Sequence, residues 1–172
     1  TEQLAPDMAA TVTGYQITKY VGATKYDAYK ASENDIPLFR TAEVYLNYAE
    51  AKAELGTLTQ SDLDISVNKL RDRVQMPHLE MAAANASPDP YLLDPVTGYS
   101  NVKGDNQGVI LEIRRERTVE LLCEGFRYWD IMRWKEGKRF ERPFYGMYFP
   151  GAGSYDLDGN GSIDFVIYEG NA

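Results

Sequence analysis

The sequence is poor in the residues that carry most nucleophilic and redox chemistry. Among its 172 residues it has one histidine, His78, and one cysteine, Cys123. A lone histidine argues against a histidine-based catalytic triad and against a zinc site built from histidine and cysteine. A lone cysteine excludes an internal disulfide. Because Cys123 lies within an apolar helical pattern, we predict a buried and unreactive thiol.

Positive charge and long apolar runs are also scarce. The formal net charge is −8, with 26 acidic and 18 basic residues, which argues against nucleic acid and anionic lipid as partners. The sequence has no run of about 18 apolar residues, so none of it is predicted to span a membrane. The opening TEQLAPDMAATVTG has neither a signal-peptide pattern nor a cysteine for lipid attachment. The length suits one domain and hardly two.

The region after residue 37 predicts a helical hairpin. Apolar residues recur every three or four positions from Leu38 to Ala53, and Gly56 fits the position just after a helix end. A short link leads to a second helix, which begins at Ser61 as N-cap and stops before Pro77. Two helices joined by so short a link form an antiparallel pair.

The region from 108 to 138 predicts a second pair of helices, over about 108–124 and 126–136. It contains both tryptophans and charges of both signs. Because charge is expensive to bury unless it is paired, this region is either a structural ion network or a functional site. Two such hairpins in series resemble tetratricopeptide-type repeats, although a solenoid needs about three units to be stable alone.

The acidic side chains of this region favour the ion network. Glu116, Glu120 and Glu124 share one helix face and could suggest a glycosidase, but nearby arginines would lower the carboxyl pKa that a general acid needs raised. We therefore predict that these charges lock the last two helices against the hairpin at 38–74. The residues assigned to the network are Arg117, Glu120, Glu124, Arg127, Asp130 and Arg133.

The remaining segments predict loops and short strands. Residues 77–107 are rich in proline, glycine, asparagine and aspartate, as in a long loop. We predict an extended segment near 11–21 and a strand at FVIY, 165–168. Helical aromatics are expected in the core: Tyr45, Tyr48, Trp129 and Trp134. Loop aromatics are expected to pack over the helices, with stacking on a sugar as the alternative: Tyr91, Tyr99, Tyr145, Tyr148 and Phe149.

The sharpest local motif lies at 156–164, DLDGNGSID. It offers side-chain oxygens at the first, third, fifth and ninth places, a glycine at the sixth and a backbone carbonyl at the seventh, as in the first nine places of an EF-hand loop. Ile167 occupies the twelfth place, where an EF-hand has glutamate, and no flanking helix is predicted. The motif predicts a structural calcium site, with an Asx-rich turn without metal as the alternative. Its ligands would be Asp156, Asp158, Asn160, Ser162 and Asp164.

Four segments together carry a resemblance to a known family. They are GYQITKY at 14–20, RTAEVYLNYAEAKAELG at 40–56, VNKLRDR at 67–73 and, most strongly, ILEIRRERTVELLCEGFRYWDIMRW at 110–134. In this order and spacing the chain resembles the C-terminal part of the SusD/RagB family, surface lipoproteins of Bacteroidetes nutrient-uptake systems. The Asp- and Gly-rich end followed by FVIYE is also similar.

The resemblance implies an all-α protein of tetratricopeptide-like hairpins with long loops and a short C-terminal β segment. It implies non-catalytic binding of oligosaccharide or peptide at the outer membrane, delivered to a SusC-type TonB-dependent transporter. Residues 1–172 would then be a fragment of a longer protein whose N-terminal lipid anchor lies outside this chain. No glycan-binding residue is assigned, because much of that site belongs to the missing part. The alternative is a helical scaffold that only docks a partner protein.

Overall fold

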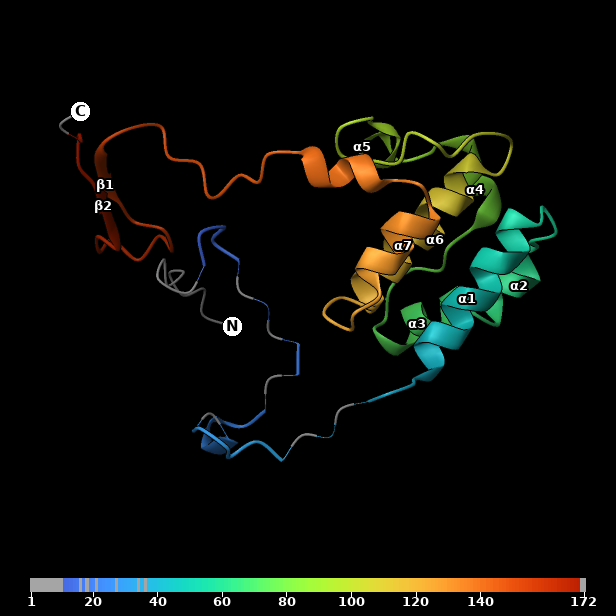
Figure 1. Cartoon of the computed structure of the whole chain (residues 1–172), viewed down its shortest axis with the longest axis horizontal. Helices are drawn as coiled ribbons and strands as arrows, with labels where there is room; N and C mark the ends of the chain where they lie inside the picture. The colour runs from blue at the N-terminus through green and yellow to red at the C-terminus, as the bar shows by residue number, and fades with distance from the viewer. Residues whose placement is uncertain are drawn as a thin grey trace. The chain divides into compact units, whose positions relative to one another are not determined.

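A computed structural model describes residues 11–15, 17, 19–20, 22–26, 28–33, 35 and 37–170 (Figure 1). The chain divides into two compact units, one from 1–34 and 141–172 and the other from 35–140. The unit from 35–140 is helical, and the other contains a two-stranded antiparallel sheet. This composition confirms the predicted all-α class with a short C-terminal β segment. None of the described helices has the length and hydropathy needed to cross a membrane.

The regular elements follow one another in a simple order. The helices are η1 (Thr24–Tyr26), α1 (Thr41–Glu54), α2 (Gln60–Asp64), α3 (Val67–Arg73), α4 (Met81–Ala86), α5 (Pro90–Leu93), α6 (Gln107–Glu120), α7 (Arg127–Arg133) and η2 (Gly137–Glu141). The strands are β1 (Gly153–Tyr155) and β2 (Phe165–Ile167). The predicted extended segment near 11–21 contains no assigned strand among its described residues.

Helix α1 forms where the apolar spacing predicts it, but it starts later. Leu38 is 81% exposed and precedes the helix, because Arg40 has the extended backbone of an N-cap. The end confirms the expectation for Gly56, which has φ +69°. Its N–H donates to the carbonyl of Ala53, and the next N–H donates to that of Lys52, both at 3.0 Å. These bonds satisfy carbonyls that a helix end leaves free.

The predicted second helix is instead two short helices, α2 and α3. Its N-cap is Thr59, not Ser61, because Thr59 and Asp62 form a reciprocal capping box. The N–H of Thr59 donates to the Asp62 carboxylate at 2.8 Å, and the N–H of Asp62 donates to the Thr59 hydroxyl at 3.2 Å. Ser66, with φ −129° and ψ −94°, separates the two helices.

The predicted long loop at 77–107 contains two short helices, α4 and α5, so that prediction is wrong in part. The alanine-rich sequence of α4 forms a helix that packs against α6. Asn85 fixes this contact, since its side-chain oxygen accepts the N–H of Val109 at 2.9 Å near the start of α6. Proline and aspartate around these short helices obscure them in the sequence.

Helices α6 and α7 are both shorter than predicted. Helix α6 ends at Glu120, and a run of turns leads to α7. Cys123 lies in these turns with φ +62°, and its side chain is exposed. The predicted buried thiol is therefore wrong, because the helical register that would have buried it ends before Cys123.

Helix α6 lies between two clusters of buried apolar side chains. The larger cluster joins α6 to α1, α2 and α3 and contains Ala42, Leu46, Ala49, Ala53, Leu58, Leu63, Val67, Leu70, Leu79, Val109, Ile113 and Leu121. The smaller joins α6 to the end of α7 and contains Leu92, Tyr99, Val102, Leu111 and Trp134. Burial of this apolar surface supplies the main driving force for packing the helices.

The aromatic residues separate into packed and exposed groups, partly against expectation. Tyr99 and Trp134 are buried and meet edge to face, with ring centroids 5.5 Å apart. Trp129, predicted in the core, is 68% exposed. Tyr145 and Tyr148, in the other unit, are 80% and 84% exposed.

The other aromatics follow the same division. Tyr45 packs against the larger cluster, whereas Tyr48 is 39% exposed and donates a hydrogen bond to Asp62 at 2.5 Å. Tyr91 is 64% exposed. Phe149 packs on the β1–β2 hairpin against Tyr155 at 4.9 Å between ring centroids. Helical periodicity alone does not tell which aromatics another element covers.

Gly108 provides a direct test of the α4–α6 contact. A Cβ at Gly108 would lie 1.9 Å from the carbonyl oxygen of Ala84. Glycine to alanine inside a helix is normally stabilising, but here we expect Gly108→Ala to lower the free energy of unfolding by about 2 kcal/mol because the backbone must move. The change in the free energy of unfolding is measured by urea denaturation, with the helical circular dichroism signal as the probe.

Gly137→Ala is the matched control, because its added Cβ would meet only the flexible end of Met132, at 3.3 Å. We expect a change within about 0.5 kcal/mol for the control. Equal effects of the two substitutions would contradict the proposed close approach of α4 and α6.

Candidate metal centre and buried ion network

The acidic motif forms the loop of the β1–β2 hairpin. The strands pair antiparallel with Tyr155 opposite Phe165, so residues 156–164 connect them. The N–H of Asp164 donates to the carbonyl of Tyr155 at 3.0 Å and closes the loop at its base. The strand pairing thus brings both ends of the motif together.

Asp156 organises the turn within this loop. Its carboxylate accepts the backbone N–H groups of Gly159 at 2.7 Å, Asn160 at 3.2 Å and Gly161 at 2.7 Å. Both glycines have positive φ, +76° and +86°, which glycine adopts without steric cost. The bond from Gly161, with those from Gly159 and Asn160, holds the pKa of Asp156 below its ordinary value against opposing desolvation, so this carboxylate is ionised at neutral pH.

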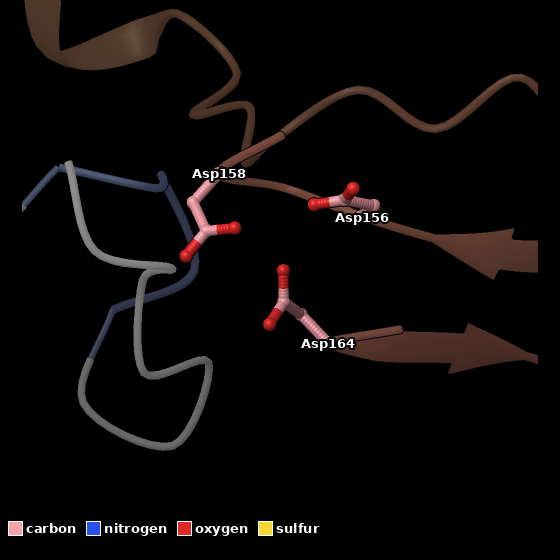
Figure 2. A group of neighbouring side chains, drawn as sticks. All are labelled: Asp156, Asp158 and Asp164. Carbon is pink, nitrogen blue, oxygen red and sulfur yellow. The ribbon is translucent and has the colours of Figure 1, made fainter. Parts of the chain in front are cut away.

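Three carboxylates converge at the loop. One oxygen each from Asp156, Asp158 and Asp164 lies within 4.8 Å of the others, and Figure 2 shows the three side chains pointing toward a common space. Carboxylate oxygens are the ligands that calcium prefers. The loop therefore offers a hard-oxygen donor set that fits such an ion.

The two remaining predicted ligands are placed differently. The side-chain oxygen of Asn160 accepts the N–H of Ser162 at 2.7 Å, and its amide donates to Asp158 at 3.0 Å. The structure thus groups the three aspartates and engages Asn160 in hydrogen bonds along the loop. Ser162 takes part in these bonds through its backbone N–H. The role of Asn160 and Ser162 as metal ligands stays a prediction.

The loop is not an EF-hand. Strands, and no helices, flank it, and Ile167 at the twelfth place lies in β2. Glu169 follows the strand and is exposed. The bidentate glutamate that completes an EF-hand therefore has no counterpart at that place.

Glu116 and Glu120 in α6, and Glu124 just after it, pair with arginines distant in sequence. Arg71 from α3 donates to Glu116 at 2.5 Å. Arg40, ahead of α1, donates to Glu120 and to Glu124, each at 2.7 Å. The bond to Glu124 contributes most to raising the pKa of Arg40.

Arg73 adds a further pair with Glu120 at 2.7 Å. The predicted ion network is present, while its arginine partners Arg40, Arg71 and Arg73 were missed. These contacts join residues 45 to 84 positions apart, and helical spacing gives no signal for them.

The most deeply buried part of the network joins α6, α7 and α1. Arg117 and Asp130 have side chains only 5% and 3% exposed, and the Nε of Arg117 lies 2.8 Å from both Asp130 oxygens. Arg117 also donates to Asn47 of α1 at 2.6 Å. This pair supports the prediction that these charges lock α6 and α7 onto the first hairpin.

Glu50 on α1 completes this cluster. It accepts hydrogen bonds from Arg133 and from the indole N–H of Trp134, the latter at 2.6 Å. Burial alone would raise the pKa of Glu50, but these hydrogen bonds and the charges of Arg133 and Arg117 outweigh burial and lower it. A carboxylate held in its charged form is suited to structural pairing and not to general-acid catalysis.

Arg127 differs from its expected role in the network. Its guanidinium donates to the hydroxyl groups of Tyr99 at 3.1 Å and Thr118 at 2.8 Å. Within the described part of the chain no carboxylate lies within ion-pair distance of Arg127. The predicted carboxylate partner is therefore wrong, because Arg127 faces the Tyr99–Trp134 cluster and not the glutamate face of α6.

Comparison with known proteins agrees with this architecture. The model of the SusD family matches residues 1–163, and the chain belongs to this family. A curated relative, SusD-like protein P38 of Formosa agariphila, is 30% identical over 115 residues. That match covers 67% of the present chain and 20% of the relative. No solved structure matches the chain.

Removing one charge from the buried pair tests its structural role. Arg117→Met leaves Asp130 buried with only Arg133 for compensation, so we expect the free energy of unfolding to fall by about 3 kcal/mol. Arg127→Met is the matched control. It removes two hydrogen bonds to neutral hydroxyls, and we expect a loss of about 1 kcal/mol. Urea denaturation measures the free energy of unfolding of both variants. Equal losses would refute a special role for the Arg117–Asp130 pair.

Proposed function

We propose that this chain belongs to a protein that binds nutrient oligosaccharides or peptides at the cell surface and passes them to a SusC-type TonB-dependent transporter. Membership in the SusD family over residues 1–163 carries this proposal. Binding occurs without catalysis. The glycan-contacting residues are not assigned within this chain.

The charge arrangement of α6 is consistent with a binding protein. Glu116, Glu120 and Glu124, which could have served as glycosidase carboxylates, each contact at least one arginine. Glycoside hydrolysis needs two carboxyl groups that face the scissile bond, whereas these three carboxylates face arginines of other segments. The pairing therefore supports a structural role for these residues.

The size of the relative supports a further proposal about the whole protein. Because the match covers only 20% of SusD-like protein P38, we propose that residues 1–172 form the C-terminal domain of a longer outer-membrane lipoprotein. An N-terminal lipid, outside this chain, would anchor it to the membrane. In the alternative, the helical unit is a scaffold that only docks a partner protein.

Native affinity electrophoresis separates the two functions. The longer protein that contains this chain is expected to migrate more slowly in gels that contain its oligosaccharide, and to release no reducing sugar from it. The same protein should co-purify with the transporter. Co-purification without retention by any oligosaccharide or peptide would favour the scaffold, and release of sugar would contradict a non-catalytic role.

We also propose that the hairpin loop holds a structural calcium ion. The convergence of Asp156, Asp158 and Asp164 supports this role. A cation there would offset the repulsion among three carboxylates and brace the loop between β1 and β2. Its contribution would be to the stability of the loop.

Chelation tests the calcium proposal. A chelator is expected to lower the melting temperature of the calcium-loaded chain, since a ligand that binds only the folded state stabilises it. Asp158→Ala should abolish this chelator effect, whereas Asp105→Ala, which removes an exposed aspartate outside the loop, should preserve it. Melting curves that do not change on chelation would exclude a stabilising ion. Scanning calorimetry provides the measurement.

A further inference from the structure

Asn160 combines a reactive sequence with an exposed position. It is the only asparagine in the chain that a glycine follows. Its side chain is exposed in the hairpin loop, and Gly161 adds no Cβ that would hinder approach to the backbone. This pairing allows the Gly161 backbone nitrogen to attack the side-chain amide of Asn160.

The reaction is a deamidation and needs only water as co-reactant. The Gly161 nitrogen loses its proton and forms a bond to Cγ of Asn160, while the C–N bond of the side-chain amide breaks and ammonia leaves with that proton. The product is a five-membered succinimide. Water then opens the ring at either carbonyl and gives aspartate or isoaspartate.

In the folded loop the attacking group, the backbone nitrogen of Gly161, is engaged in a hydrogen bond. The N–H of Gly161 donates to Oδ2 of Asp156 at 2.7 Å. Attack requires that this charge-assisted bond break and that the amide lose its proton beside a negative carboxylate, and both steps are unfavourable. In addition, the Asn160 side chain is fixed by Ser162 and Asp158.

We propose that Asn160 is a deamidation site whose conversion is held back by the hydrogen bond between Asp156 and Gly161. The hairpin loop is thus chemically protected while it keeps this turn, and it is modified when the turn opens. Conversion to aspartate adds a negative charge beside Asp156, Asp158 and Asp164. Isoaspartate lengthens the main chain by one methylene and displaces the residues leading into β2.

The test follows deamidation at each asparagine in the intact chain. The chain is incubated at mildly alkaline pH with a chelator, so that no bound cation contributes, and is analysed by peptide mapping and isoaspartate detection. Asp156→Ala is expected to accelerate conversion at Asn160 about tenfold, because a hydrogen bond to a charged group contributes roughly this factor. Asp156→Asn, which keeps an oxygen acceptor without the charge, should give an intermediate rate.

Asp164→Ala is the matched control. It removes another carboxylate of the same group, but Asp164 accepts the N–H of Leu157 and leaves the Gly161 bond in place. We expect its rate to stay near that of the parent chain. Equal acceleration by both alanine variants would assign protection to general loop order, and no acceleration by Asp156→Ala would remove the role of Asp156. Faster conversion at another asparagine in that variant would also overturn the proposal.

Discussion

The helical unit depends on the buried ion pair between Arg117 and Asp130. Each of these charges would be costly in the interior alone, and the low exposure of both makes their mutual pairing obligatory. Glu50 and Arg133 extend the pair to α1, so a single charge cluster fixes three helices. Apolar burial drives the helices together, whereas this cluster specifies which faces meet, because a shift of one turn would leave charges unpaired.

The same principle explains why the segment 110–134 can hold so many charges of both signs. Its outward glutamates reach Arg40 and Arg71, which lie ahead of α1 and in α3, and its inward charges meet Glu50. One helix thus carries two sets of ion pairs and two apolar clusters. A surface whose charges are already paired within the chain is suited to holding the fold together. The proposed binding function therefore belongs to surfaces other than the α6 charge network.

The acidic hairpin loop follows a different logic. There, like charges are gathered and backbone N–H groups stabilise one of them, Asp156. Such a loop is well organised without apolar burial, because its hydrogen bonds run between residues close in sequence. This local character explains why the aspartates could be recognised from spacing alone, and why the turn also controls the chemistry available to Asn160.

The sequence by itself determined the helical class, the approximate places of α1, α6 and α7, strand β2, and the acidic loop, because periodicity, glycine ends and alternating aspartates are local signals. It did not reveal α4, whose alanines are hidden among turn residues, or the capping role of Thr59. Only the tertiary structure decided that Trp129 and Cys123 are exposed. It also decided that Arg127 bonds hydroxyl groups while Arg40 and Arg71 pair with the glutamates. Helical spacing gives the face on which a side chain lies, but its partner comes from an element up to 84 residues away.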